Sequence, residues 1–390
     1  MDHLPSEITT QILSRLPVKF VFRCRSVCKT WMIIIDDRRL FASLHFTRSL
    51  EEGTNNKSTF IFASSGNCHP VYIVGQEHEQ SLFKSTQIHV SDSNYNAVHA
   101  NSFNGLLCFS TKTKQSNGFC TYIHNPATQE CVKLPDSNSS QELTYINRGV
   151  RFFVYNLGFG LDHSSNVLKV LQVIGVSHGL RHAAPAKAQV CTVGSNSWRK
   201  LENFPRVSWF RGTPALINGS LHWMSYEHIL SFDLATEKFG FVELPQINLP
   251  RRRHGVRPGN DFRLVALDGC LSVADSSSDE DIELWIMKEY NVKESWIKLV
   301  IRRRYVEDAV FKNVIPISFW KNGELLLLYG STILVSYEIE SGRYTPLEIE
   351  GLPAYRYDSF KGSYAYEVFS YVGNLMSIDT ICRTQVQLLS

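Results

Sequence analysis

A repeating pattern of turns and short apolar runs is the feature that most constrains the fold of this chain. An Asn-Gly or Asp-Gly dipeptide precedes a short apolar run at four places, with glycines at Gly105, Gly219, Gly269 and Gly323. Such a dipeptide beside apolar runs is typical of a β-hairpin. The glycines are separated by 114, 50 and 54 residues, so the first interval spans two units of about 50 residues.

A second strand–turn–strand element follows most of these hairpins, most clearly in residues 122–135 and 230–245. Two hairpins in about 50 residues are typical of a four-stranded blade of a β-propeller at the kelch period. Residues 59–390 therefore predict about six blades, with the choice between six and seven left open. Residues 366–379 are too few for a blade. We expect them to close the ring by pairing with strands from residues 59–90.

The first 47 residues follow a helical period instead. Apolar residues from Leu4 to Leu16 lie on one face of a 3.6-residue repeat. Pro17, Ser26 and either Asp36 or Asp37 predict the starts of three more short helices. So short a unit cannot bury all its large apolar side chains, and it either packs on the rest of the chain or keeps a face for a partner. Residues 48–58 are polar and aperiodic, which predicts a linker.

The net charge of +3 belongs to this helical head. Residues 1–47 contain seven Lys or Arg and four Asp or Glu, whereas residues 48–390 contain 33 of each sign. A neutral body argues against a nucleic-acid surface, which requires clustered basic residues. The basic head suits an acidic partner.

The lack of a membrane-spanning run and of a signal-peptide pattern predicts a location in the cytoplasm, the nucleus or both. No apolar run approaches the length that spans a bilayer, and the start of the chain has no signal-peptide pattern, so we expect no membrane association. The nine cysteines are odd in number and scattered, without a Cys-x-x-Cys pair, which favours reduced thiols.

Motifs that carry bond chemistry are absent from the sequence. It contains no nucleophile elbow, phosphate-binding loop or zinc-binding helix motif, and its thirteen histidines are dispersed. We therefore predict no catalytic residues, no metal and no cofactor.

Two segments of the body are candidates for binding a target protein. Arg251, Arg252 and Arg253 form a basic run that could hold an anion, although a solvated loop is the favoured interpretation. Trp209, Phe210 and Arg211 could form an exposed aromatic anchor, and packing within a blade is at least as plausible.

The head resembles the F-box motif, especially its plant form. The resemblance rests on Leu4-Pro5, Ile12-Leu13, the run Arg15-Leu16-Pro17-Val18-Lys19, the run from Arg25 to Lys29, and Trp31. Phe20-Val21-Phe22 and Arg38-Arg39 depart from the usual residues. F-box units dock on the Skp adaptor of an SCF (Skp–cullin–F-box) ubiquitin ligase. Transferred by position, the resemblance implies ten adaptor-binding residues: Leu4, Pro5, Ile8, Ile12, Leu13, Leu16, Pro17, Val21, Val27 and Trp31.

The body resembles the plant F-box-associated domain. The similar segments are residues 157–170, 215–223 and 229–233. Together the two resemblances imply a mainly β protein, with a small helical F-box at residues 1–47, a linker at 48–58 and a kelch-like propeller at 59–390.

The function implied is a non-catalytic substrate receptor. It would bind a Skp-type adaptor, and through it a cullin and a RING subunit, and present an unidentified protein for ubiquitination and proteasomal degradation. Two alternatives stay open. One is a propeller hydrolase, which would require several carboxylates converging from the inner strands, whereas the inner-strand candidates, residues 106–109, 221–223, 271–273 and 325–328, are almost wholly apolar. The other is an adaptor-bound scaffold without a degradation target.

Overall fold

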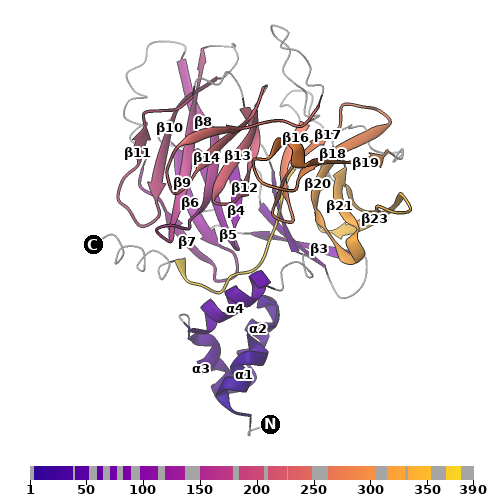
Figure 1. The fold of residues 1–390 in the computed structure, drawn as a ribbon. Helices are drawn as coiled ribbons and strands as arrows, with labels where there is room; N and C mark the ends of the chain where they lie inside the picture. Colours follow the sequence, from indigo (N-terminus) through magenta and orange to yellow (C-terminus); the bar gives the residue numbers. More distant parts are fainter. Residues whose placement is uncertain are drawn as a thin grey trace.

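The computed structural model describes residues 4–37, 40–51, 59–64, 71–76, 82–88, 97–112, 119–136, 150–178, 184–205, 210–225, 227–247, 262–303, 314–329, 333–352 and 366–378. Figure 1 shows a helical head below a body of β-sheets. The mainly β fold with a small helical N-terminal unit is therefore confirmed.

The head consists of four short helices, as predicted: α1 (Ser6–Leu13), α2 (Val18–Cys24), α3 (Lys29–Asp36) and α4 (Leu40–Glu51). Because α4 continues to Glu51, residues 48–51 of the predicted linker are helical. Arg48 Nη1 donates to Gln11 O at 2.7 Å, and His45 Nε2 donates to Leu16 O at 2.8 Å. These contacts hold α4 against α1. The rest of the predicted linker, residues 52–58, lies outside the described residues.

The sequence predicted N-caps for α3 and α4, and one of the two is correct. Asp37 Oδ1 accepts a hydrogen bond from Leu40 N at 2.9 Å, which confirms one predicted cap. The prediction of Ser26 as the other cap was wrong. Main-chain bonds continue the turn after α2 through Val27, so the extended N-cap conformation first occurs at Cys28, whose Sγ accepts from Trp31 N at 3.5 Å.

The body contains six four-stranded units in the described residues, in agreement with the predicted six blades. Blade 1 is β24 (Tyr366–Ser370), β1 (Thr59–Ser64), β2 (Val71–Gln76) and β3 (Leu82–Ile88). Blade 2 is β4 (Ala97–Phe103), β5 (Leu106–Lys112), β6 (Phe119–Asn125) and β7 (Glu130–Lys133). Blade 3 is β8 (Val150–Asp162), β9 (Val167–His178), β10 (Ala184–Thr192) and β11 (Arg199–Leu201).

The last three blades repeat this order. Blade 4 is β12 (Phe210–Ile217), β13 (Ser220–Ser225), β14 (Ile229–Asp233) and β15 (Phe239–Val242). Blade 5 is β16 (Phe262–Leu267), β17 (Cys270–Asp275), β18 (Asp281–Met287) and β19 (Trp296–Arg302). Blade 6 is β20 (Val314–Phe319), β21 (Leu325–Tyr329), β22 (Ile333–Glu338) and β23 (Arg343–Glu350).

The ring closes through the C-terminal strand. The first strands of blades 2–6 contact one another in sequence, and β24 completes the circle between β20 and β4. β24 pairs antiparallel with β1, from Phe60 opposite Ser370 to Ser64 opposite Tyr366. The predicted pairing of the C-terminal segment with an early strand is therefore confirmed. In addition, β23 pairs in parallel with β3 at the outer side of the junction.

The apolar runs that the sequence suggested as inner strands occupy the second position of their blades. Residues 106–109, 221–223, 271–273 and 325–328 lie in β5, β13, β17 and β21. That prediction was wrong, and the reason is burial. A second strand has neighbours on both edges and both faces, so it becomes the most apolar strand of its blade.

Residues 157–170, one of the segments that resemble the F-box-associated domain, lie in β8 and β9 and contact blade 4. A Cβ added to Gly158 would lie 2.4 Å from Leu221 Cδ1, so any larger residue would require Leu221 of β13 to move. At the far end of β8, Lys169 Nζ lies 2.9 Å from Asp162 Oδ2 and 2.9 Å from Glu237 Oε1 of blade 4. The same ammonium donates to Leu234 O at 2.7 Å. A buried cation thus joins two blades through three oxygen atoms.

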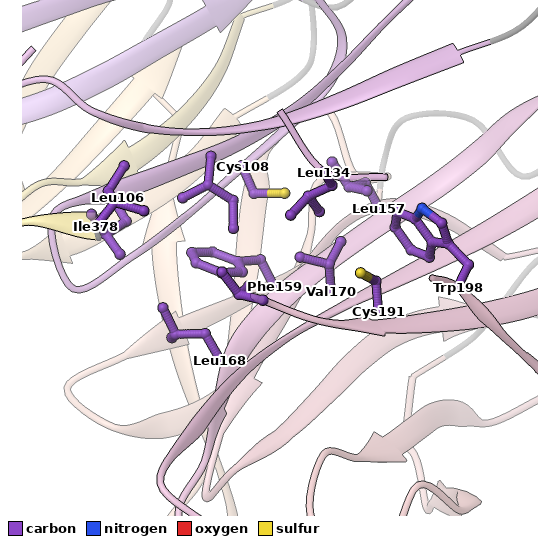
Figure 2. Close-up of a cluster of buried hydrophobic side chains, with 12 residues drawn as sticks. Leu106, Cys108, Leu134, Leu157, Phe159, Leu168, Val170, Cys191, Trp198 and Ile378 are labelled. Carbon is purple, nitrogen blue, oxygen red and sulfur yellow. The ribbon is translucent and has the colours of Figure 1, made fainter. Parts of the chain in front are cut away.

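Residues 371–378 follow β24 as an extended segment, hereafter the strap, which runs between the head and blade 2 (Figure 1). Tyr371 N donates to Thr59 O at 2.9 Å, so the strap begins where the last strand pair ends. At its other end, Ile378 is fully buried in a cluster shared by blades 2 and 3, beside Leu106 (Figure 2).

The two ends of the blades differ in their connections. The strap contacts Asn104 and Gly105, which form the turn from β4 to β5, so the tight turns between first and second strands lie on the head-proximal face. Because the strands alternate in direction, the connections from each blade to the next leave from the opposite face. We call this face, where the fourth strand of one blade ends and the first strand of the next begins, the head-distal face.

Candidate functional site

An exposed apolar line on the first helix is the strongest candidate site. Leu4, Ile8 and Ile12 lie four residues apart and therefore follow one another on one side of α1 and its start. Their side chains are 57%, 47% and 50% exposed. A contiguous apolar line in contact with water is typical of a surface that a partner covers.

The structure separates the ten predicted adaptor-binding residues by burial. The exposed ones are Leu4, Pro5, Ile8, Ile12, Pro17 and Val27, and the half-buried ones are Leu16 and Trp31. Leu13 and Val21 are buried in the core of the head, together with Ile35 and Phe41. In the chain alone, Leu13 and Val21 pack beneath the exposed apolar residues of the head. Their direct contact with an adaptor stays a prediction.

Four exposed apolar residues of the head were missed by sequence reasoning. Phe22, Met32, Ile33 and Leu40 are 41%, 37%, 68% and 76% exposed. The signal that could have found Met32 and Ile33 is the run from Met32 to Ile35, where four consecutive apolar residues cover a full helical turn. Such a turn cannot face the core on all sides. The head therefore has more exposed apolar surface than the motif alone predicts.

The head also has exposed basic side chains. Between Ile8 and Ile35 the sequence has five Lys or Arg and no Asp or Glu, and all five are exposed: Arg15, Lys19, Arg23, Arg25 and Lys29. Arg25 forms a two-pronged pair with Asp36, with Nε–Oδ1 and Nη2–Oδ2 distances of 2.6 and 2.9 Å. Hydrogen bonding to this carboxylate raises the pKa of Arg25. The head thus combines apolar and basic surface.

The candidate target-binding residues of the body are only partly placed. Phe210 and Arg211 begin β12 on the head-distal face. Trp209, Arg251, Arg252 and Arg253 lie outside the described residues. The structure therefore does not bring these two groups together, and their role stays a prediction.

A histidine of blade 4 is buried at the boundary with blade 5. His222 is fully buried, and its Nε2 lies 2.8 Å from Tyr290 Oη of blade 5. Its Nδ1 lies 3.2 Å from Ala215 O. Burial lowers the pKa of His222 to about 4. The imidazole is thus neutral at physiological pH and joins two blades.

The described ranges contain neither a cluster of metal-binding side chains nor a helix suited to a membrane. No three His, Cys, Asp or Glu side chains there lie close enough together to share a metal ion. None of the helices in that part of the chain has the length and apolar character of a membrane span.

Comparisons with known proteins match both parts of the chain. An F-box-like family model matches residues 1–47, and the F-box associated beta propeller domain matches residues 57–372. Among relatives from Arabidopsis thaliana, F-box protein At5g49610 is 30% identical, with 75% of this chain and 77% of that protein covered. F-box protein At3g07870 is 26% identical, with 90% and 89% covered, and F-box protein CPR1 is 26% identical, with 91% and 86% covered. The chain therefore belongs to the plant F-box proteins that carry an F-box associated β-propeller domain.

Proposed function

We propose that this protein is the substrate-recognition subunit of an SCF-type ubiquitin ligase. Its head would dock on a Skp-type adaptor, which connects it to a cullin and a RING subunit. Its propeller would bind the protein to be ubiquitinated. Family membership supports the class of function, and the exposed apolar line of α1 carries the docking proposal.

The apolar line supports docking because water is a poor environment for it. Leu4, Ile8 and Ile12 are about half exposed although the rest of the head has a packed core. Covering this surface with an apolar partner helix would release ordered water and stabilise the complex. The exposed basic residues of the head would favour a partner with an acidic surface and speed their encounter.

The head-distal face is the proposed target-binding face. An adaptor bound at the head covers the opposite side of the molecule, so a target at the head-distal face would not compete with it. Phe210 and Arg211 lie at the edge of this face. Trp209 and the arginines at 251–253 remain candidates on the basis of the sequence alone.

The receptor would act by proximity, without bond chemistry of its own. Holding a target near a partner-bound ubiquitin-conjugating enzyme raises the effective concentration of the target's lysines. The hydrolase alternative would require converging carboxylates. Within the described residues, the first strands of the ring carry Asp162 and Glu367, and Asp162 is engaged by Lys169. This arrangement gives the hydrolase no support.

Co-purification of the full chain with a recombinant Skp-type adaptor tests the proposal. A stoichiometric complex on size exclusion is the expected result, and no complex at micromolar concentrations would overturn it. The scaffold alternative is separated by inhibiting the proteasome in the native tissue. A bound protein that accumulates supports a degradation target, whereas bound proteins that all stay constant favour the scaffold. Fractionation of that tissue would test the proposed location in the cytoplasm, the nucleus or both.

A further inference from the structure

The strap at residues 371–378 has one side on the propeller and the other on the head. On the propeller side, Asn125 Nδ2 donates to Asn374 O and to Met376 O, each at 2.9 Å. Asn374 Nδ2 donates to Asn104 O at 3.0 Å, and Ile378 N donates to Glu130 Oε2 at 2.7 Å. Four hydrogen bonds therefore hold the strap along blade 2.

The head side of the strap is apolar. Leu375 is 7% exposed and lies in the same cluster as Leu13, Val21 and Phe41, the core of the head. Gly373 lies against α2 so closely that an added Cβ would be 2.8 Å from Val18 Cγ2. The core of the head is thus completed by a residue more than 320 positions away in the sequence.

Two connections therefore join the head to the propeller. The covalent one is the chain between α4 and β1. The strap adds a second, packed connection on the strand that closes the ring. Two separated attachments restrict rotation, which one attachment cannot do.

We propose that the strap is a positioning element, which fixes the orientation of the adaptor-binding surface relative to the target-binding face. Its consequence for ubiquitin transfer rests on the proposed function, whereas the fixed orientation does not. Leu375 and Gly373 are the positioning residues on the head side. They act by determining which lysines a bound conjugating enzyme can reach.

A cross-link between the strap and α2 tests the fixed orientation. In the double variant Val18→Cys with Gly373→Cys, the added Cβ lies 3.1 Å from the Cβ of residue 18, so a separation by about 0.5 Å brings the pair into the range of a disulfide. We expect an intramolecular cross-link on mild oxidation, detected as a mobility shift. Adding Leu375→Asp should slow it at least about tenfold, because a carboxylate is expelled from the core of the head. Cross-linking no faster than in either single-cysteine variant, or unchanged by Leu375→Asp, would overturn the proposal.

The functional consequence is tested in a reconstituted ligase by mapping the lysines of this chain that become ubiquitinated. For the wild type we expect a restricted set. Leu375→Asp should broaden the set while leaving adaptor binding and the melting temperature of the propeller unchanged. If Leu375→Asp unfolds the head, Gly373→Leu provides the second variant, because it displaces only the contact with Val18. Ile297→Asp, an exposed residue of blade 5, is the control.

The outcomes separate the two proposals. An identical set of modified lysines in the wild type and in both strap variants contradicts the positioning role. A wild-type chain that binds no adaptor and is not modified contradicts the proposed function, while the cross-linking result stands independently of it.

Discussion

Asn125 Nδ2 donates a hydrogen bond of 2.9 Å to the main-chain oxygen of Asn374, which lies 249 positions later in the chain. The Oδ1 atom of Asn125 accepts from Ala127 N at 3.0 Å, so both ends of its fully buried amide are engaged. A residue at the turn between β6 and β7 thus holds the main chain of the strap at the ring closure.

Replacing this amide should destabilise the protein. Asn125→Ala would leave two main-chain oxygens of the strap without their donor, and each buried unsatisfied group costs about 1–3 kcal/mol. We expect a free energy of unfolding lower by about 2–4 kcal/mol in urea denaturation. The control is Asn196→Ala, the same substitution in an exposed turn of blade 3. Equal effects of the two substitutions would show that the contact with the strap contributes nothing.

The buried cation between blades 3 and 4 gives a second stability prediction. Lys169→Met would leave the buried Asp162 without a cation, and Glu237 with Arg199 alone as its partner, at a cost of about 3–5 kcal/mol near pH 7. Lys238→Met, at an exposed neighbouring site, provides a control with the same change of side chain. A loss below about 1 kcal/mol, similar to the control, would contradict this reading of the contact.

The effect of Lys169→Met should also depend on pH. Burial raises the pKa of Asp162, but hydrogen bonds from Ser165, Ser164 and Lys169 outweigh it and leave the pKa well below its usual range. The pKa of Glu237 is also lowered, because hydrogen bonds from Arg199 and Lys169 outweigh the effect of burial. A carboxyl group whose pKa is lowered by folding stabilises the fold at pH values above its unfolded pKa of about 4. This stabilisation is lost as the pH falls from about 4 toward the folded pKa. The difference between wild type and Lys169→Met should therefore shrink from pH 7 to pH 3, as measured by chemical denaturation.

His222 predicts a separate loss of stability at milder acidity. Its folded pKa of about 4 lies below the ordinary value of 6.5, so the unfolded chain binds the proton more readily. Its contribution to stability is complete above pH 6.5 and is lost as the pH falls to about 4, by about 3 kcal/mol in total. His222→Gln should flatten the stability profile in this window. A profile as steep as that of the wild type would mean that His222 does not titrate in this way.

How far the sequence predicts this fold depends on the range of the interactions. The turns at Gly105, Gly219, Gly269 and Gly323 are local, and they predicted the blades correctly. The order of strands within a blade was harder, because the runs at residues 106–109 and 325–328 look like inner strands yet occupy the second position. Their apolar character reports burial, which is greatest in the middle of a blade.

The candidate site shows the same limit. The motif identified the exposed Ile8 and Ile12 together with the buried Leu13. In a short helix, apolar residues occur both on the face that packs inward and on the face left for a partner, so the residue type alone does not distinguish the two faces. The strap was invisible to sequence reasoning beyond its pairing strand. Leu375 is an isolated leucine without periodicity, and only the three-dimensional structure shows that it completes the core of a head formed by the first 51 residues.

The docking surface is tested most directly by the affinity of the full chain for a Skp-type adaptor, measured by titration calorimetry for the wild type, Ile8→Asp and Ile297→Asp. Ile8 and Ile297 are both 47% exposed, so the same substitution is made at matched exposure in the head and in the propeller. The account predicts that Ile8→Asp weakens binding at least about tenfold and that Ile297→Asp leaves it unchanged. Equal affinities for all three proteins would contradict it.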